Sequence, residues 1–160
     1  MSNVAKAEFD TQPICEPAIR TIAMPADTNP AGDIFGGWLL SQMDLAAGNA
    51  AARHARGRCA TVAVDKIAFV RPVRVGDEVT VFAQLAQVGR TSMQFRVSAW
   101  RRAHDSERVA KVTEAVFTFV ALDSEGHPRL VPPNPTASED ADPDRAAVNR
   151  SEERRVGKEC

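Results

Sequence analysis

The most informative segment of this chain is Asn29-Pro-Ala-Gly-Asp-Ile-Phe-Gly-Gly-Trp-Leu-Leu-Ser-Gln-Met-Asp44. A turn-forming stretch runs into two glycines, Gly36 and Gly37, which open an apolar helical segment. Glycines at a helix start leave backbone N–H groups bare, so an oxygen that carries negative charge can approach them closely. Asp44 lies on the same helix, where an acid is costly unless it is used or paired. Together these features indicate a site that stabilises an oxyanion and supplies a base or nucleophile, as acyl transfer requires.

The residues from about Phe35 to Arg56 are predicted to form one long helix. The apolar positions recur with the spacing of a single helical face, at Leu39, Met43, Ala46, Ala47 and Ala50. The many alanines keep this face slim, as a helix that is closely wrapped by a sheet needs to be. Gly57 follows the basic end of the segment and is predicted to stop the helix.

Strand patterns precede and follow this helix in the sequence. A short strand that proline ends is expected within residues 18–25, before the helix. Four longer strands are predicted after it, at residues 60–70, 78–88, 91–102 and 109–122. All four are separated from one another by segments of turn residues. One strand, one long helix and a run of antiparallel strands predict an α+β domain whose sheet curls around the helix.

The composition excludes several classes of protein. The chain has 160 residues, a formal net charge of −1 and a pI near 6.3, so no basic stripe favours nucleic acid. Its three cysteines form neither a CxxC motif nor a His/Cys ligand spacing, and no metal site is predicted. The N-terminus lacks the apolar core of a signal peptide, and no apolar run approaches the roughly 20 residues that span a membrane. A soluble cytoplasmic protein without nucleic-acid or membrane partners is expected.

The chain is expected to hold one domain with a tail at each end. Residues 1–17 are polar and interrupted by prolines, which predicts a flexible arm. Residues 18–132 carry all the periodic segments and form the predicted domain. Residues 133–160 are rich in Pro, Asp, Glu and Arg, which predicts disorder. The last ten residues show no periodicity and no relation to the domain, and the sequence does not establish that they are native.

Several motifs spread along the chain resemble those of a known family. They are Thr21-Ile-Ala-Met-Pro-Ala-Asp-Thr-Asn, Gly32-Asp-Ile-Phe-Gly-Gly-Trp, Ser41-Gln-Met-Asp44, Thr61-Val-Ala-Val, Phe69-Val-Arg-Pro-Val with Val75-Gly-Asp, Gly89-Arg-Thr-Ser, and Ala115-Val-Phe-Thr-Phe-Val-Ala with Asp123-Ser-Glu-Gly. The chain resembles the hotdog-fold acyl-CoA thioesterases, specifically the YciA-type branch, from about Arg20 to Pro132. Related enzymes often carry histidine where this chain has Phe35, and the YciA branch shares that departure.

The resemblance implies a hotdog fold, an acyl-CoA substrate and hydrolysis without a metal or redox cofactor. It also implies self-association as a dimer, usually within a trimer of dimers. In this family the acid at the position of Asp44 is the essential carboxylate. The loop residue at the position of Asp33 assists it from the other chain.

The spacing of the acids along the helix suggests how such a site is assembled. The N–H groups of Gly36 and Gly37 are the expected oxyanion donors. Asp44 lies seven residues beyond Gly37, or about 10 Å at 1.5 Å per residue, so it cannot reach a carbonyl held at its own helix start. In a two-fold dimer an antiparallel partner helix brings a second Asp44 to that position. The expected site is therefore shared between subunits.

The roles of the two acids leave alternatives open. Asp44 is expected to act as the general base for water, with a nucleophile that forms an acyl-aspartyl anhydride as the rival role. Asp33 is expected to orient the water or hold the loop. The structural alternatives are a helix N-cap for Asp33 and an acid paired with an arginine at the subunit interface for Asp44.

The expected substrate contacts rest on weaker signals. Arg71 precedes a proline at a strand end and is a candidate for a phosphate of coenzyme A. The hairpin Gly89, Arg90, Thr91 and Ser92 offers small donors and a cation, and family members use this loop near the coenzyme. An ordinary exposed turn residue is the alternative for each. Trp38 is expected either to floor the acyl tunnel or to pack at the interface.

Two other functions are compatible with the same fold. One is a sensor that holds an acyl-CoA without cleaving it, because fold alone does not determine activity. The presence of both Asp33 and Asp44 favours catalysis, since a sensor needs no costly acid. The other is a hydratase or dehydratase, which would require a catalytic histidine in the helix region. The helix carries only His54, near its end.

Overall fold

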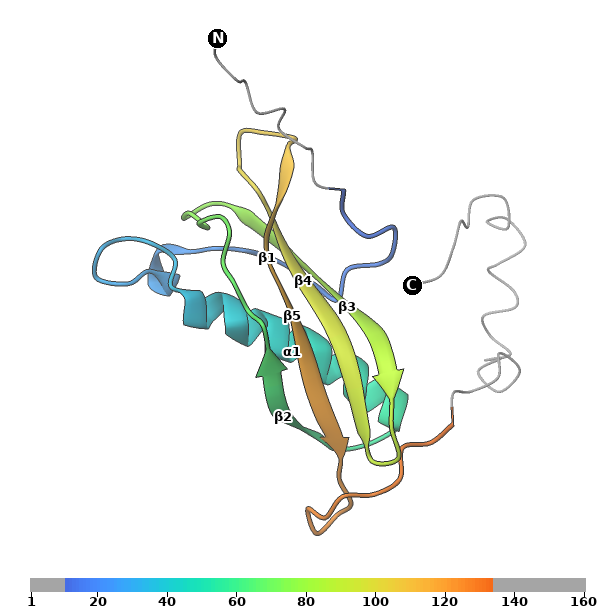
Figure 1. Ribbon diagram of the computed structural model, residues 1–160. Helices are drawn as coiled ribbons and strands as arrows, with labels where there is room; N and C mark the ends of the chain where they lie inside the picture. The colour runs from blue at the N-terminus through green and yellow to red at the C-terminus, as the bar shows by residue number, and fades with distance from the viewer. Residues whose placement is uncertain (1–10, 134–160) are drawn as a thin grey trace, which may run out of the picture.

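A long helix crosses the hollow of a five-stranded antiparallel sheet in this protein (Figure 1). The structure is a computed structural model, and it describes residues 11–133. The elements run in the order β1 (Ile19–Ile22), the short 3-10 helix η1 (Pro25–Asp27), α1 (Gly36–Ala55), β2 (Cys59–Asp65), β3 (Glu78–Val88), β4 (Ser92–Arg102) and β5 (Val109–Ala121). The strand order across the sheet is β1-β3-β4-β5-β2. The predicted α+β architecture is confirmed.

The helix fits the sheet because its inner face is small. That face is buried and consists of Leu39, Met43, Ala46, Ala47, Ala51 and Ala55. It packs on apolar side chains of the three central strands, among them Met93, Phe117 and Phe119. Gly48 extends the slim surface, since a Cβ atom at this position would already contact the Phe119 ring at 3.6 Å. Alternation of apolar residues along β5 places its large side chains against the helix.

The residues that cap the two ends of α1 differ from the sequence-based predictions. The N-cap is Phe35, which makes no side-chain capping hydrogen bond, so the alternative of Asp33 as an N-cap is wrong. At the other end the left-handed residue is Arg56, with φ of 52°, and the predicted stop at Gly57 is one residue late. Gly57 lies close to Arg129: a Cβ atom there would lie 2.8 Å from a nitrogen at the end of that side chain, so the guanidinium would have to shift.

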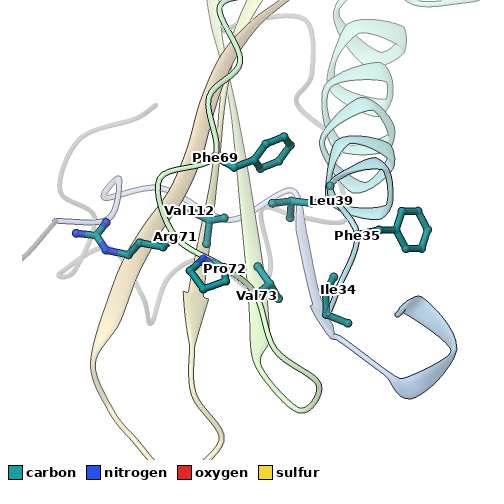
Figure 2. Close-up of a pocket in the computed structure, with 9 residues that line it drawn as sticks. Ile34, Phe35, Leu39, Phe69, Arg71, Pro72, Val73 and Val112 are labelled. Atoms are coloured by element: carbon teal, nitrogen blue, oxygen red, sulfur yellow. The ribbon is translucent and has the colours of Figure 1, made fainter. Parts of the chain in front are cut away.

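Strand β2 is shorter than the predicted strand of residues 60–70. It ends at Asp65 because Lys66 adopts a left-handed φ of 55°, which breaks the pleat. The segment that follows stays close to β5 through one backbone hydrogen bond, from the Val70 N–H to the Val112 carbonyl (2.9 Å). As a result the segment around Phe69 crosses toward the start of α1, where it forms one wall of the site described below (Figure 2).

Residues 1–10 of the predicted arm, and residues 134–160 of the predicted disordered tail, lie outside the part of the chain that the structure describes. Within residues 11–133, no helix combines the length and the apolar character needed to cross a membrane.

The turn before β3 is held by a buried carboxylate, that of Asp77. Its Oδ2 accepts hydrogen bonds from Arg101 Nη1 (3.0 Å) and from the Arg74 N–H (2.9 Å). We expect Asp77→Ala to lower the free energy of unfolding by about 2 kcal/mol, because two donors lose a charged partner. Urea denaturation measures this. Glu107→Ala is the matched control, since that carboxylate binds Arg102 in full solvent. An equal loss in both variants would contradict the assignment.

Candidate active site

The first turn of α1 presents unused backbone donors. Gly36 and Gly37 are the first two helical residues, so their N–H groups have no partner inside the helix. Within residues 11–133 no loop carbonyl or side chain accepts a hydrogen bond from either group, whereas the Trp38 N–H donates to the Phe35 carbonyl (3.1 Å). Both glycines are exposed. The helix dipole adds partial positive charge at the same end. This position is suited to bind an oxygen on which negative charge develops.

A pocket of about 240 Å³ adjoins this helix start. It is lined by Ile34, Phe35, Gly36, Leu39, Phe69, Arg71, Pro72, Val73 and Val112. Figure 2 shows Phe69, Leu39, Val112 and Val73 around the same space, with the ring of Phe69 extended toward the start of α1. The ring lies close to the backbone, because a Cβ atom built on Gly36 would be 3.2 Å from two of its carbons. An apolar chamber therefore opens directly beside the proposed oxyanion donors.

Asp44 lies further along α1, on the side that faces β2. Its Oδ1 accepts a hydrogen bond of 2.6 Å from Thr61 Oγ1. The carboxylate is half-buried, and in the described part of the chain it forms no ion pair. Thr61 holds the acid in place, yet its role was missed by the sequence analysis because the two residues lie 17 positions apart. Asp44 remains about 10 Å from Gly37 along the helix, as its spacing predicts.

Asp33 lies in the loop that leads into the helix. The loop is closed by two hydrogen bonds. The Asn29 N–H donates to the Asp33 carbonyl (2.8 Å), and the Asp33 N–H donates to the side-chain oxygen Oδ1 of Asn29 (3.1 Å). The side chain of Asp33 is exposed and has no hydrogen-bond partner among residues 11–133. One chain therefore holds the loop in shape and leaves this carboxylate available.

The predicted substrate-binding residues do not gather at one place in a single chain. Arg71 lines the pocket, but its guanidinium turns away from it and donates to the Lys111 carbonyl (2.7 Å) (Figure 2). Trp38 is half-buried and packs against the core. The hairpin Gly89, Arg90, Thr91 and Ser92 is closed by a hydrogen bond from the Gly89 N–H to the Ser92 carbonyl (2.7 Å).

That hairpin lies at the far end of the helix. The Arg90 carbonyl accepts a hydrogen bond from the Val131 N–H, and the neighbouring Arg129 guanidinium donates to the Ala55 carbonyl in the last turn of α1. Figure 1 shows the β3–β4 turn beside the C-terminal end of α1, opposite the helix start. In one chain the helix start and the hairpin are therefore separated by the length of a 20-residue helix.

Strand β2 forms an exposed edge of the sheet next to Asp44. It pairs with β5 on one side only, and most of its side chains are exposed. Val62 lies at a register shift, and its side chain is 58% exposed. On the adjacent helix Leu45 is 61% exposed. An apolar edge strand with free backbone groups is a surface on which a second chain can pair.

Among residues 11–133, no three His, Cys, Asp or Glu side chains gather to bind a metal.

The chain is similar in sequence and fold to known thioester hydrolases. Residues 31–107 match the model of the thioesterase superfamily. The acyl-CoA thioester hydrolase YciA of Escherichia coli is 49% identical over 117 residues, which are 71% of this chain and 89% of that protein. An uncharacterized acyl-CoA thioester hydrolase of Zymomonas mobilis is 49% identical over 136 residues, 83% of this chain and 91% of that protein. The crystal structure of a hexameric thioesterase from Yersinia pestis is similar with a TM-score of 0.73 and 45% identity, over 77% of this chain and 100% of that chain.

Proposed function

The chain belongs to the acyl-CoA thioester hydrolases of the thioesterase superfamily, with a hotdog fold, and we propose that it cleaves acyl-CoA at a site shared between two subunits. The proposal rests on the distance that separates the oxyanion donors from the acid within one chain. The free N–H groups of Gly36 and Gly37 lie at the helix start, and the acid Asp44 lies about 10 Å along the same helix. A subunit alone cannot bring both to one carbonyl.

In the proposed reaction the thioester carbonyl oxygen accepts hydrogen bonds from the Gly36 and Gly37 N–H groups of one subunit. Asp44 of the second subunit takes a proton from water, and the water oxygen bonds to the carbonyl carbon. The negative charge that develops on the carbonyl oxygen is stabilised at the helix start. The carbon–sulfur bond then breaks, and coenzyme A leaves as a thiolate that takes the proton from Asp44. These steps require neither a metal nor a redox cofactor.

The surroundings of Asp44 support its proposed role as the general base. The hydrogen bond from Thr61 orients one carboxylate oxygen and leaves the other available to a water molecule. The half-buried position of Asp44 beside an apolar strand edge would become enclosed when a second chain covers that edge. Asp33 is proposed to orient the attacking water from the subunit that carries the glycines, since its side chain is exposed in the adjoining loop.

The subunit contact is proposed to form along the edge strand β2. Pairing of β2 with its symmetry mate would satisfy the free backbone groups of the edge and cover Val62, Val64 and Leu45. A two-fold axis there runs the two α1 helices in opposite directions, which brings each Asp44 toward the partner's helix start. The similar thioesterase from Yersinia pestis is hexameric, and we propose a trimer of such dimers for this chain.

The coenzyme is proposed to lie near the hairpin of the second subunit. Antiparallel helices bring the hairpin of one subunit toward the helix start of the other, and Arg90 at its tip is exposed. Its guanidinium is suited to bind a phosphate of coenzyme A. Arg71, which donates a hydrogen bond to the Lys111 carbonyl, is a second candidate for a phosphate.

A salt-dependent loss of affinity is expected when Arg90 is replaced. Arg90→Gln should raise KM for acyl-CoA by about tenfold and leave kcat unchanged, because it removes a contact that is equal in the ground and transition states. The difference from wild type should shrink as ionic strength rises. Steady-state kinetics at two salt concentrations measure this. Arg96→Gln is the matched control. Arg96 on β4 also has an exposed guanidinium, but it pairs with Glu114 on β5. A large fall in kcat for Arg90→Gln would contradict the assignment.

Thiol release distinguishes the proposed hydrolase from a sensor that only holds acyl-CoA. The purified protein is incubated with acetyl- to palmitoyl-CoA, and free coenzyme A is followed with a thiol-reactive dye. Turnover of at least one acyl-CoA is the expected result. Binding without release of thiol from any of them would overturn the proposal.

A further inference from the structure

The pocket beside the helix start has the chemistry of an acyl-chain site. Its lining is formed almost wholly by aliphatic and aromatic side chains, and its one charged member, Arg71, turns away from the space (Figure 2). A pantetheine arm carries two amide groups, and burial of these groups without hydrogen bonds is costly. An alkyl chain has no such requirement and gains from each methylene that leaves water. The apolar lining therefore favours the acyl chain over the coenzyme arm.

The location of the pocket agrees with this assignment. Gly36 belongs to its lining and also carries one of the proposed oxyanion donors. A thioester whose carbonyl oxygen binds at the helix start would therefore have the mouth of an apolar chamber within reach of its acyl carbons. The volume of about 240 Å³ sets the scale. A methylene is similar in size to a water molecule, so a space of this size holds several carbons of an alkyl chain.

Phe69 is the most exposed large hydrophobic side chain in this lining, at 48%, followed by Phe35 at 42%, whereas Leu39 and Val73 are buried. It lies after the end of β2, in the segment that crosses toward the start of α1. Its ring is so close to Gly36 that a Cβ atom built there would lie 3.2 Å from two ring carbons. The ring thus takes up space between the oxyanion donors and the rest of the chamber.

We propose that this pocket binds the acyl chain of the substrate and that Phe69 sets the length of chain that fits. The proposal rests on the hydrolase function proposed above and adds a specificity-determining residue to it. Removal of the ring in Phe69→Ala lengthens the chamber, and the larger ring of Phe69→Trp fills it. The two substitutions should therefore move the preference in opposite directions.

The test compares the ratio of kcat/KM for dodecanoyl-CoA to that for butanoyl-CoA. Phe69→Ala should raise this ratio about tenfold, since differences of one methylene or more in an apolar pocket change rates by this order. Phe69→Trp should lower it. Val70→Ala is the matched control, because its side chain is exposed next to Phe69 and does not line the pocket. This variant should keep the wild-type ratio.

A ratio is used because contact of the Phe69 ring with Gly36 can change all rates together. An equal change for both substrates leaves the ratio at the wild-type value and overturns the proposal for Phe69, while the hydrolase function stands. If the wild type releases no thiol from any acyl-CoA, the proposed function itself fails. The two failures are therefore distinguishable in one experiment.

Discussion

Asp44→Asn is expected to lower kcat for acyl-CoA hydrolysis by a factor of about 10²–10⁴, the usual contribution of a positioned base. The amide matches the carboxylate in shape and can still accept the hydrogen bond from Thr61, so the local structure should persist. It cannot take a proton from water. Thiol release at saturating acyl-CoA measures the effect.

Asp65→Asn serves as the matched control for this variant. Asp65 is an exposed aspartate at the end of β2, in the strand that also holds Thr61, and should retain wild-type kcat. A variant of Asp44 with more than a tenth of wild-type activity would contradict its role. Single turnover in water enriched in oxygen-18 tests the rival role of a nucleophile. Label in the Asp44 carboxylate would show an acyl-aspartyl anhydride that water opens at the aspartyl carbonyl, whereas a base places the label in the fatty acid only.

The second large effect is expected from deletion of one backbone donor. Proline is tolerated at the first position of a helix, and Phe35 before Gly36 has the extended conformation that proline requires, with φ of −78° and ψ of 146°. Gly36→Pro thus removes the N–H group and is compatible with the helix. Loss of an oxyanion donor of this kind lowers kcat by about 10²–10³.

Gly36→Ala is the control that isolates the N–H group. It adds the same Cβ atom, which would meet the Phe69 ring at 3.2 Å, but it retains the donor. We expect Gly36→Ala to retain most of the activity that Gly36→Pro loses. Equal kcat values for the two variants would show that the Gly36 N–H does not bind the oxyanion. Circular dichroism confirms that α1 persists in both.

The elements that were predicted well depend on local patterns. Strands β3 and β4 match the predicted ranges of 78–88 and 91–102 to within one residue, because alternation and turn glycines are visible in neighbouring positions. Most of the apolar face of α1 was predicted from its spacing, although Ala50 in the predicted set is only partly buried and the buried residue at that level is Ala51. The helix start at Gly36 was also predicted, since the pair of glycines follows a turn.

The features that were missed depend on contacts between distant residues. Strand β2 ends early because Lys66 turns left-handed, and no pattern marks that residue. Gly57 lies against the guanidinium of Arg129, which is more than 70 residues later. The hydrogen bond from Thr61 to Asp44 and the place of Phe69 beside Gly36 follow from the way β2 and its following segment pass the helix. Such placement cannot be inferred from spacing along the chain.

The most direct test of a shared site mixes two inactive variants. Asp44→Asn and Gly36→Pro subunits are unfolded together, refolded as a random mixture and assayed for thiol release. In a two-fold dimer of one subunit of each kind, one site combines the intact glycine of the first with the intact Asp44 of the second, and the other site carries both defects. Half of the dimers are mixed, so about a quarter of the wild-type activity should return. A mixture as inactive as its two components would contradict a site built from two subunits.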